Sequence, residues 1–301
     1  MKKLFCLVLS VFLFSCNSKE KKVVKNAPAK VVEKEIMTEL YGSWVGDFIV
    51  KERDTTRPVS EMYINKINIS IKKITESEVT GQSVVAGNSR MLKGKITKEG
   101  NRVHFTLKEP GDDKNDGIFD FEIKNDTLLV GTWTANNTKK EVTKRSFELT
   151  KKEFKYNPNA MLPEEGIYVD YQNPKAAEVK NTNEVTEDAE GEEMDYDMDD
   201  SLYRVASESI MKLNSSTQKL KESDLKNLKK IDLEILRNTI FARHGLTFKT
   251  KTVRQFFDQV EWYIPVSGNV DNQLTSIEKE NIAILKRFEK YAIDNYDTFG
   301  R

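Results

Sequence analysis

The spacing of the apolar residues changes once along this sequence, and that change constrains the fold more than any other feature. From about Leu40 to Lys152, apolar and polar residues alternate in short runs between turn residues, which is the pattern of strands. Beyond about Ser201 the apolar residues recur every three to four positions, which is the pattern of amphipathic helices. We therefore expect a multidomain α and β chain, with an antiparallel β-barrel over 40–152 and a small all-α domain over 201–295.

Alternating runs in the first part predict about eight strands. A two-residue turn at Asn125 and Asp126 would bring two of them together in an antiparallel pair. Eight strands joined by short turns can close as an up-and-down barrel that is filled by side chains or holds one small ligand. The runs are "SWVGDFIV", "MYINKINISI", "EVTGQSVVA", "MLKGKIT", "RVHFTLK", "IFDFEIK", "TLLVGTW" and "RSFELTK".

Gly42-Ser43-Trp44 in the first run resembles the Gly-x-Trp motif of lipocalin-like barrels, and Gly131-Thr132-Trp133 repeats it. The resemblance implies a barrel whose first tryptophan either plugs the closed end or borders a binding pocket. His104 has the polar parity of its strand, opposite Val103 and Phe105, so we expect a solvated histidine on the outer face. No second histidine or acidic cluster nearby argues for a metal there.

The N-terminal segment "MKKLFCLVLSVFLFSC" predicts export, because two lysines precede an apolar run that is too short to span a membrane. Leu13–Cys16 ("LFSC") resembles the lipobox of bacterial lipoproteins, in which the cysteine is lipidated, with palmitate among its acyl chains. We expect a signal peptide over 1–15, a lipid on Cys16 and a tether over 16–39. An ordinary secretory signal is the alternative. Cys6 leaves with the signal, so the mature chain would have no free thiol.

The predicted anchor implies a cell-envelope protein of the outer membrane that works at a membrane surface. The lysine-rich run after Cys16 weakly resembles a surface-display signal, so a periplasmic and a surface-facing orientation both stay open. The zero formal charge conceals a strong asymmetry. Between Glu184 and Asp200 there are ten acidic residues and no lysine or arginine, whereas 201–301 has 17 basic and 13 acidic residues. We expect a disordered acidic linker over 153–200.

Two aspartate-rich stretches partly resemble calcium-binding loops. Asp195, Asp197 and Asp199 have the initial spacing of an EF-hand, but Asp200 and Ala206 stand where that loop needs glycine and glutamate. Loose cation binding in roughly the millimolar range is the only calcium chemistry left for this stretch. The stretch over 111–117, "GDDKNDG", is predicted to be a hairpin loop.

In the helical part, we expect a first helix from Leu233 to His244, with Asp232 as N-cap, Ile231 as a staple residue on Leu236, and Gly245 as the left-handed terminator. A second helix is predicted from a Thr252 and Gln255 capping box up to "EWYIP". A third would begin at Thr275 with Glu278 as its capping partner. Its apolar stripe would be Ile277, Ile284, Leu285, Phe288 and Tyr291.

The segments "LRNTIFARHGLTF", "FF", "WYIP" and "LTSIEKENIAIL" resemble the YARHG domain in order and spacing, over roughly 220–289. Phe241 replaces the tyrosine that gives the family its name. The resemblance implies a small domain of exported bacterial proteins with no established activity, and therefore says more about location than about chemistry.

Two functions fit these residues. The preferred one is a binding or interaction module, for a wall component, a small apolar ligand or an envelope protein. The alternative is an enzyme that processes envelope polymer through His244 and Arg237, although no nucleophile motif, zinc motif or carboxylate pair supports it. An inhibitor that uses the loop over 108–117 is a third possibility. We expect no cofactor, no metal and no nucleic-acid partner, and the oligomeric state is left open.

The candidate ligand-binding residues come from the helical part. A structural interpretation competes with binding: Arg237 and Asn238 would satisfy loop carbonyls, and Arg243 and His244 would stabilise the negative end of the helix dipole. The candidates are Arg237, Asn238, Arg243, His244, Trp262 and Tyr263.

Overall fold

A computed structural model describes residues 33–100, 102–163, 169–171 and 203–293 of the 301-residue chain. The predicted signal, Cys16, most of the tether and the acidic run lie outside the described residues. From Lys34 onward the chain forms one compact unit. Among the described helices, none has the length and apolar character needed to cross a membrane.

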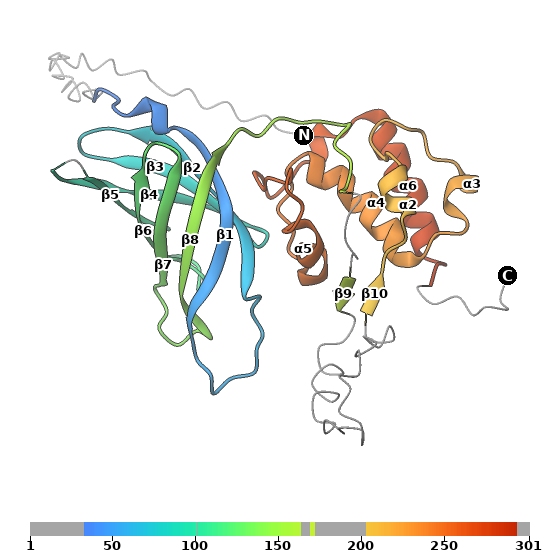
Figure 1. Cartoon of the computed structure of the whole chain (residues 1–301), viewed down its shortest axis with the longest axis horizontal. Helices are drawn as coiled ribbons and strands as arrows, with labels where there is room; N and C mark the ends of the chain where they lie inside the picture. The colour runs from blue at the N-terminus through green and yellow to red at the C-terminus, as the bar shows by residue number, and fades with distance from the viewer. Residues whose placement is uncertain (1–32, 101, 164–168, 172–202, 294–301) are drawn as a thin grey trace, which may run out of the picture. The chain divides into compact units, whose positions relative to one another are not determined.

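Eight antiparallel strands close into an up-and-down barrel, as the alternating runs predict (Figure 1). Each strand pairs with its neighbours in sequence, and β1 pairs with β8 to close the barrel. The strands are β1 (Gly42–Arg53), β2 (Ile64–Ile74), β3 (Val79–Val85), β4 (Asn88–Glu99), β5 (Arg102–Lys108), β6 (Gly117–Lys124), β7 (Leu128–Ala135) and β8 (Val142–Lys152).

One end of the barrel is closed by the chain that leads into β1. The short 3-10 helix η1 (Thr38–Leu40) lies against this end, and Nε1 of buried Trp44 donates to the Leu40 carbonyl over 3.1 Å. Ile36 and Met37 also pack against the barrel core. The tether predicted over 16–39 is therefore wrong at its C-terminal end, because these apolar residues belong to the folded part.

Aromatic and aliphatic side chains fill the barrel interior. Successive inward positions are nearly all buried, and five phenylalanine rings pack with centroids 5.0 to 6.3 Å apart. Closed-end and central interior positions include Trp44, Ile67, Ile69, Phe105, Phe121, Phe147 and Leu149. The predicted turn is also present: Asn125 and Asp126 have φ of 51° and 55°, and Thr127 N–H donates to the Lys124 carbonyl.

His104 lies half-exposed on the outer face as expected, with Asp120 and Glu122 of the next strand beside it.

The C-terminal part is helical, with a second hydrophobic core of its own (Figure 1). A two-stranded sheet, β9 with β10, precedes the helices. The elements are β9 (Val169–Tyr171), β10 (Tyr203–Val205), α2 (Ser209–Lys212), α3 (Glu222–Leu225), α4 (Lys230–Arg243), α5 (Lys251–Phe257), the 3-10 helix η3 (Asp271–Gln273) and α6 (Ser276–Glu289).

Helix ends agree with the sequence in part. Gly245 has φ of 73° after α4, and Thr275 with Glu278 forms the capping box of α6, so both predictions are confirmed. The predicted start of α4 is wrong. Its N-cap is Lys229, and Asp232 occupies the third helical position, from which it accepts the Lys229 N–H. Ile231 therefore lies inside the helix and cannot be a staple residue before it.

The second helix also differs from the expectation. α5 begins after Thr250 rather than Thr252, and it ends at Phe257, before "EWYIP". Tyr291 lies beyond the end of α6 and is 71 % exposed. Asn281 and Ile282, which the predicted stripe does not include, are buried. The predicted stripe of α6 is thus wrong at its last position.

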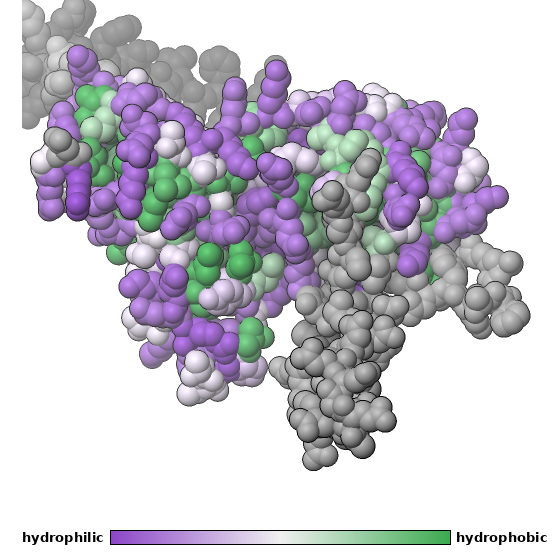
Figure 2. All heavy atoms as spheres, in the orientation of Figure 1, coloured by the Kyte–Doolittle hydropathy of each residue, from purple (hydrophilic) through white to green (hydrophobic). Residues whose placement is uncertain are grey.

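The barrel and the helical part meet over polar side chains on the outer face of β2. Lys66 Nζ donates to the Val260 carbonyl over 2.6 Å, and Asn68 Nδ2 donates to the Pro265 carbonyl over 2.9 Å. Both residues are buried, because helical-part residues cover a face that the alternation alone would assign to solvent. On the face shown in Figure 2, most of the coloured surface is hydrophilic.

The chain leaves β8 as an ordered segment, residues 153–163, which we call the strap. The strap lies on the helical part and ends with Leu162 in its core. The linker predicted from residue 153 is therefore wrong at its start. Proline residues prevent regular structure there, as expected, but side-chain contacts hold the backbone in place.

Candidate functional site

His244, the residue on which an enzymatic interpretation depends, is buried in a cluster that clamps the strap. Its Nε2 lies 2.9 Å from Oε2 of Glu278, and the two side chains are only 4 % and 0 % exposed. The Tyr156 ring of the strap stacks on the imidazole at 4.3 Å, and its hydroxyl donates to Oε1 of Glu278 over 3.0 Å. The backbone N–H and the hydroxyl of Thr275 also donate to Glu278.

This carboxylate is fully occupied by protein donors. Burial pulls the pKa of Glu278 upward, but the hydrogen bonds from Thr275 and His244 outweigh burial and hold the pKa below its usual 4.5. General-base chemistry needs a reachable substrate proton, and a nucleophile needs a free base beside it. The arrangement instead joins the end of α4, the start of α6 and the strap.

Arg243 and Trp262 hold the next stretch of the strap. Nε of Arg243 donates to the Ala160 carbonyl over 2.9 Å, and its Nη1 donates to the Ser216 hydroxyl over 2.9 Å. Nε1 of Trp262 donates to the Met161 carbonyl over 2.8 Å. Burial lowers the pKa of Arg243 to about 10. The polar atoms of both side chains are thus engaged with the fold.

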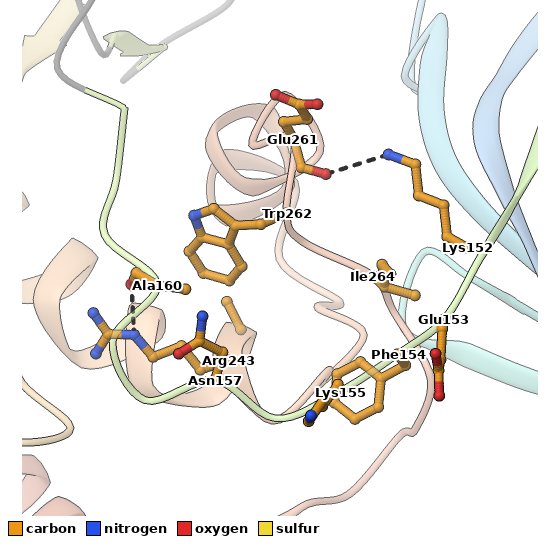
Figure 3. A pocket seen from close by; sticks show the side chains of 11 residues that line it. Lys152, Glu153, Phe154, Lys155, Asn157, Ala160, Arg243, Glu261, Trp262 and Ile264 are labelled. Atoms are coloured by element: carbon orange, nitrogen blue, oxygen red, sulfur yellow. Dashed lines mark hydrogen bonds between the residues drawn. The ribbon is translucent and has the colours of Figure 1, made fainter.

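A cavity of about 490 Å³ lies beside these two residues, under the strap (Figure 3). We call it the strap cavity. Lys152 and Phe154 form its other side, and Lys152 Nζ lies 3.5 Å from the Glu261 carbonyl. The cavity brings together only Arg243 and Trp262 of the six predicted binding residues.

The other predicted binding residues lie elsewhere in the helical part. Arg237 forms a two-bond ion pair with Glu289 of α6, at 2.6 and 3.1 Å, and its Nη1 donates to Asn238 Oδ1. Tyr263 is buried in the core, where its hydroxyl donates to the Leu246 carbonyl over 2.6 Å. The expectation that Arg237 satisfies loop carbonyls is wrong, because its partner is a carboxylate. Arg243 binds the loop carbonyl instead.

The open end of the barrel holds a second cavity, of about 300 Å³, which we call the barrel mouth. It lies where the β1–β2, β3–β4, β5–β6 and β7–β8 loops meet, opposite the end that Trp44 closes. Its apolar wall is formed by Phe48, Phe119 and Trp133. The remaining lining is strongly polar, and three of its cations, Lys249, Lys251 and Arg254, come from the helical part.

Arg145 projects into the barrel mouth from β8. Its Nη1 donates to the carbonyls of Phe48 and Tyr63, and its Nη2 donates to the Met62 carbonyl, at 3.0 to 3.3 Å. The guanidinium also lies over the Phe48 ring, 5.2 Å from its centroid. Burial, with a smaller contribution from the charge of Arg254, lowers the pKa of Arg145 to about 10 against the attraction of Glu61.

Arg254, in α5, is the second buried arginine of the barrel mouth. Its Nη1 donates to Oδ1 of Asn65 in β2 over 2.9 Å, so it links the helical part to the barrel. Its Nε is buried and has no hydrogen-bond partner among the described residues. Burial lowers the pKa of this arginine as well.

Acidic residues of the barrel mouth are held by other barrel groups. Glu109 accepts hydrogen bonds from the Ser83 hydroxyl, the Gly117 N–H and Nε1 of Trp133, at 2.7 to 3.2 Å. Burial nevertheless raises the pKa of Glu109 above its usual 4.5. Asp116 forms a two-bond ion pair with Arg90, at 2.7 and 2.9 Å, and accepts N–H groups of its own loop, the predicted hairpin loop over 111–117.

Sequence reasoning missed these residues, although a signal was present. Arg145 alternates in register with the inward-facing Phe147 and Leu149, and Glu109 does so with Phe105 and Leu107. A charge at an inward parity position indicates either a polar core group or a barrel end. Nothing local indicates that Arg254 of α5 reaches the same place.

Among the described residues, no group of three or more His, Cys, Asp or Glu side chains could hold a metal ion. The family model of the YARHG domain matches residues 207–290, which extends the predicted range at its N-terminal end. No curated protein and no solved structure matches the chain.

Proposed function

Because residues 207–290 form a YARHG domain, we propose that this chain is a lipid-anchored cell-envelope protein that acts as a binding module, with its ligand in the barrel mouth. The predicted export signal and Cys16 support the anchor, and the resemblance to a domain of exported proteins supports the compartment. The described part of the chain would then face either the periplasm or the exterior.

One observation carries the binding part of this proposal. The barrel core is filled at its closed end and along its centre, yet a cavity remains at the open end, lined by apolar rings and convergent polar groups. Such a combination is typical of small-molecule sites. The cavity volume of about 300 Å³ lies at the lower limit of ligand pockets, which favours a small ligand over a polymer.

The geometry gives the polymer-processing alternative no support. A catalytic His244 would need access to substrate, but the imidazole faces Glu278 and stacks on Tyr156 inside the protein. Arg237, the other residue of that hypothesis, is engaged by Glu289. A clamp for the strap accounts for these contacts without any reaction.

A test of binding uses the full chain, purified in detergent with its anchor. Small molecules that are released on denaturation are identified by mass spectrometry. Val85→Phe narrows the barrel mouth and should abolish the released molecule. The same change at the opposite end, Val103→Phe, and His244→Ala should both leave it. If all three variants lose the released molecule equally, or all three retain it equally, the proposal is contradicted.

A separate test addresses the anchor. Cells that express the full chain are labelled with an alkyne analogue of palmitate, and label on the protein is measured. The wild-type chain should be labelled and should sediment with membranes, whereas Cys16→Ser should lose the label. Cys6→Ser is the control, since Cys6 belongs to the predicted signal. Labelling of the Cys16→Ser chain would contradict the proposed anchor.

A further inference from the structure

We propose that the barrel mouth takes a small organic oxyanion, a carboxylate or a phosphate carried on an apolar or aromatic body, with its charged group between Arg145 and Arg254. This inference rests on the proposed binding function and specifies the ligand's chemistry. One arginine belongs to β8 and the other to α5, so the ligand would contact both parts of the chain.

Both guanidiniums are buried without an anionic partner among the described residues. Arg145 is 5 % exposed and Arg254 is 7 % exposed. Within the described residues, no ion pair within 4.0 Å joins either of them to a carboxylate. A buried charge is costly unless it is paired and hydrogen-bonded. Backbone carbonyl oxygens satisfy part of the Arg145 guanidinium and the Asn65 amide oxygen satisfies part of Arg254, whose Nε donor has no acceptor among the described residues.

The two cations also share one cavity, which brings repulsion between them. Both guanidiniums line the barrel mouth, and the charge of Arg254 contributes, after burial, to the lowered pKa of Arg145. An oxyanion between them would remove that repulsion and supply the missing acceptor. Arginine also presents a planar fork of donors that fits carboxylate and phosphate oxygens.

The acidic residues that the structure describes around the barrel mouth do not provide this anion. Glu109 is held by three barrel donors and Asp116 is paired with Arg90. Glu61 attracts both arginines, but it is exposed at the rim and acts only at longer range. Glu141 and Asp258 each attract one arginine, yet Glu141 is bound to Ser60, and Asp258 accepts the Lys66 N–H outside the barrel.

Three rings define the rest of the ligand. Phe48 packs against Phe119 at 6.2 Å and against Trp133 at 5.9 Å, and all three border the cavity. They form an apolar wall beside the two cations, while the other side is cationic through Lys140, Lys249 and Lys251. A molecule with one charged end and one ring-sized apolar end matches this division.

The test titrates the full chain in detergent, by calorimetry, with four water-soluble probes. Phenylacetate and phenyl phosphate separate the two sources of the anion, phenylacetamide has the same body without charge, and inorganic phosphate has charge without a body. We expect one of the aromatic anions to bind at least tenfold more tightly than phenylacetamide and inorganic phosphate.

Variants then locate the charge. Arg254→Gln should weaken the anion about 10- to 100-fold, the range of a lost hydrogen bond to a charged group, with little change for phenylacetamide. Arg287→Gln is the control, because it removes the same charge from an exposed side chain of α6 and should leave anion binding unchanged. At Arg145 the variant is Arg145→Lys, because a lysine keeps a cation beside the loop carbonyls that Arg145 binds and Arg145→Gln does not. Arg145→Lys should weaken anion binding at least fivefold. Thermal unfolding of each variant verifies that it is folded.

Different failures are distinguishable. If phenylacetamide binds as tightly as the anions, and Val85→Phe abolishes binding of both, the binding function stands and the oxyanion inference is overturned. If the anions bind but Arg254→Gln and Arg287→Gln behave alike, the position between the arginines is overturned. If no probe binds at millimolar concentration, the inference is overturned as well.

Discussion

Replacing Glu278 by alanine tests whether the His244 cluster is structural, because this one carboxylate accepts four hydrogen bonds. It receives two donors from Thr275, one from Tyr156 and one contact from His244, at 2.9 to 3.0 Å. The change removes the capping box of α6, worth about 1 kcal/mol, and takes a hydrogen-bond partner from buried His244 and from half-buried Tyr156, at about 1 to 2 kcal/mol each. We expect Glu278→Ala to lower the free energy of unfolding by about 3 to 5 kcal/mol.

The assay is denaturant unfolding of the full chain at neutral pH, with Glu280→Ala as the matched control. Glu280 lies two positions further along α6 and forms only an exposed ion pair with Lys219. Exposed pairs contribute at most about 1 kcal/mol. If the two variants have unfolding free energies within about 1 kcal/mol of each other, the reasoning about the cluster is refuted.

The same carboxylate gives a pH dependence with a defined sign. Its pKa is lowered in the folded chain, so the stability it contributes is present above pH 4.5 and is lost as the pH falls through the folded-state value. Glu278→Ala should therefore flatten the acid side of the stability profile. Denaturant midpoints between about pH 3 and pH 7 measure this difference, and an unchanged acid slope would contradict it.

Three further predictions concern other buried groups. Burial raises the pKa of Asp258 to about 6, so the stability that this group contributes is fully present below pH 3.8 and is lost as the pH rises through about 6. In denaturant unfolding, Asp258→Asn should have the same unfolding free energy as the wild type near pH 4. At pH 8 the variant should be more stable than the wild type by at most about 3 kcal/mol. His244→Ala should lower the unfolding free energy by about 1 to 3 kcal/mol while probe binding by calorimetry stays within twofold of wild type, and lost binding in a folded variant would contradict the structural interpretation. Trp44→Phe should lower the unfolding free energy by about 1 to 3 kcal/mol, because it leaves the Leu40 carbonyl unpaired and the ring is smaller. Trp133→Phe removes a hydrogen bond to Glu109 and a wall of the barrel mouth, so it should also weaken the binding of aromatic probes.

The barrel could be predicted because each strand carries its own signal. Inward residues such as Ile67, Ile69 and Ile71 are uniformly apolar, and left-handed positions at Asn125 and Asp126 fall on residues that tolerate them. Local chemistry likewise located Gly245 and Thr275. These features depend on neighbours within a few residues, which a sequence displays directly.

Features that depend on distant partners were not predictable in the same way. Lys66 and Asn68 have the polar parity of solvent-facing residues, yet residues nearly 200 positions later cover them. The strap has no period, since its prolines interrupt regular structure, and its order comes from contacts with α4 and α6. Asp232 was misplaced because aspartate is favoured at two positions of a helix start: at the N-cap, where it accepts N–H groups of the first turn, and at the third helical position, where it accepts the N–H of the N-cap residue.

The candidate site shows the same division. Arg145 could be recognised as a charge at an inward position, but its neighbour Arg254 belongs to another part of the chain and carries no local mark. The sequence singles out Arg243, Trp262 and Tyr263 as candidate ligand-binding residues. Their polar atoms bind backbone carbonyls, which sequence alone cannot distinguish from binding a ligand.

The central claim is that the ligand lies in the barrel mouth and not beside the helical cluster. A crystal of the full chain with 4-bromophenylacetate tests this directly, because the anomalous signal of bromine locates the probe. The account predicts bromine against Phe48, Phe119 and Trp133, with the carboxylate between Arg145 and Arg254. Bromine in the strap cavity beside Arg243 and Trp262 would contradict it.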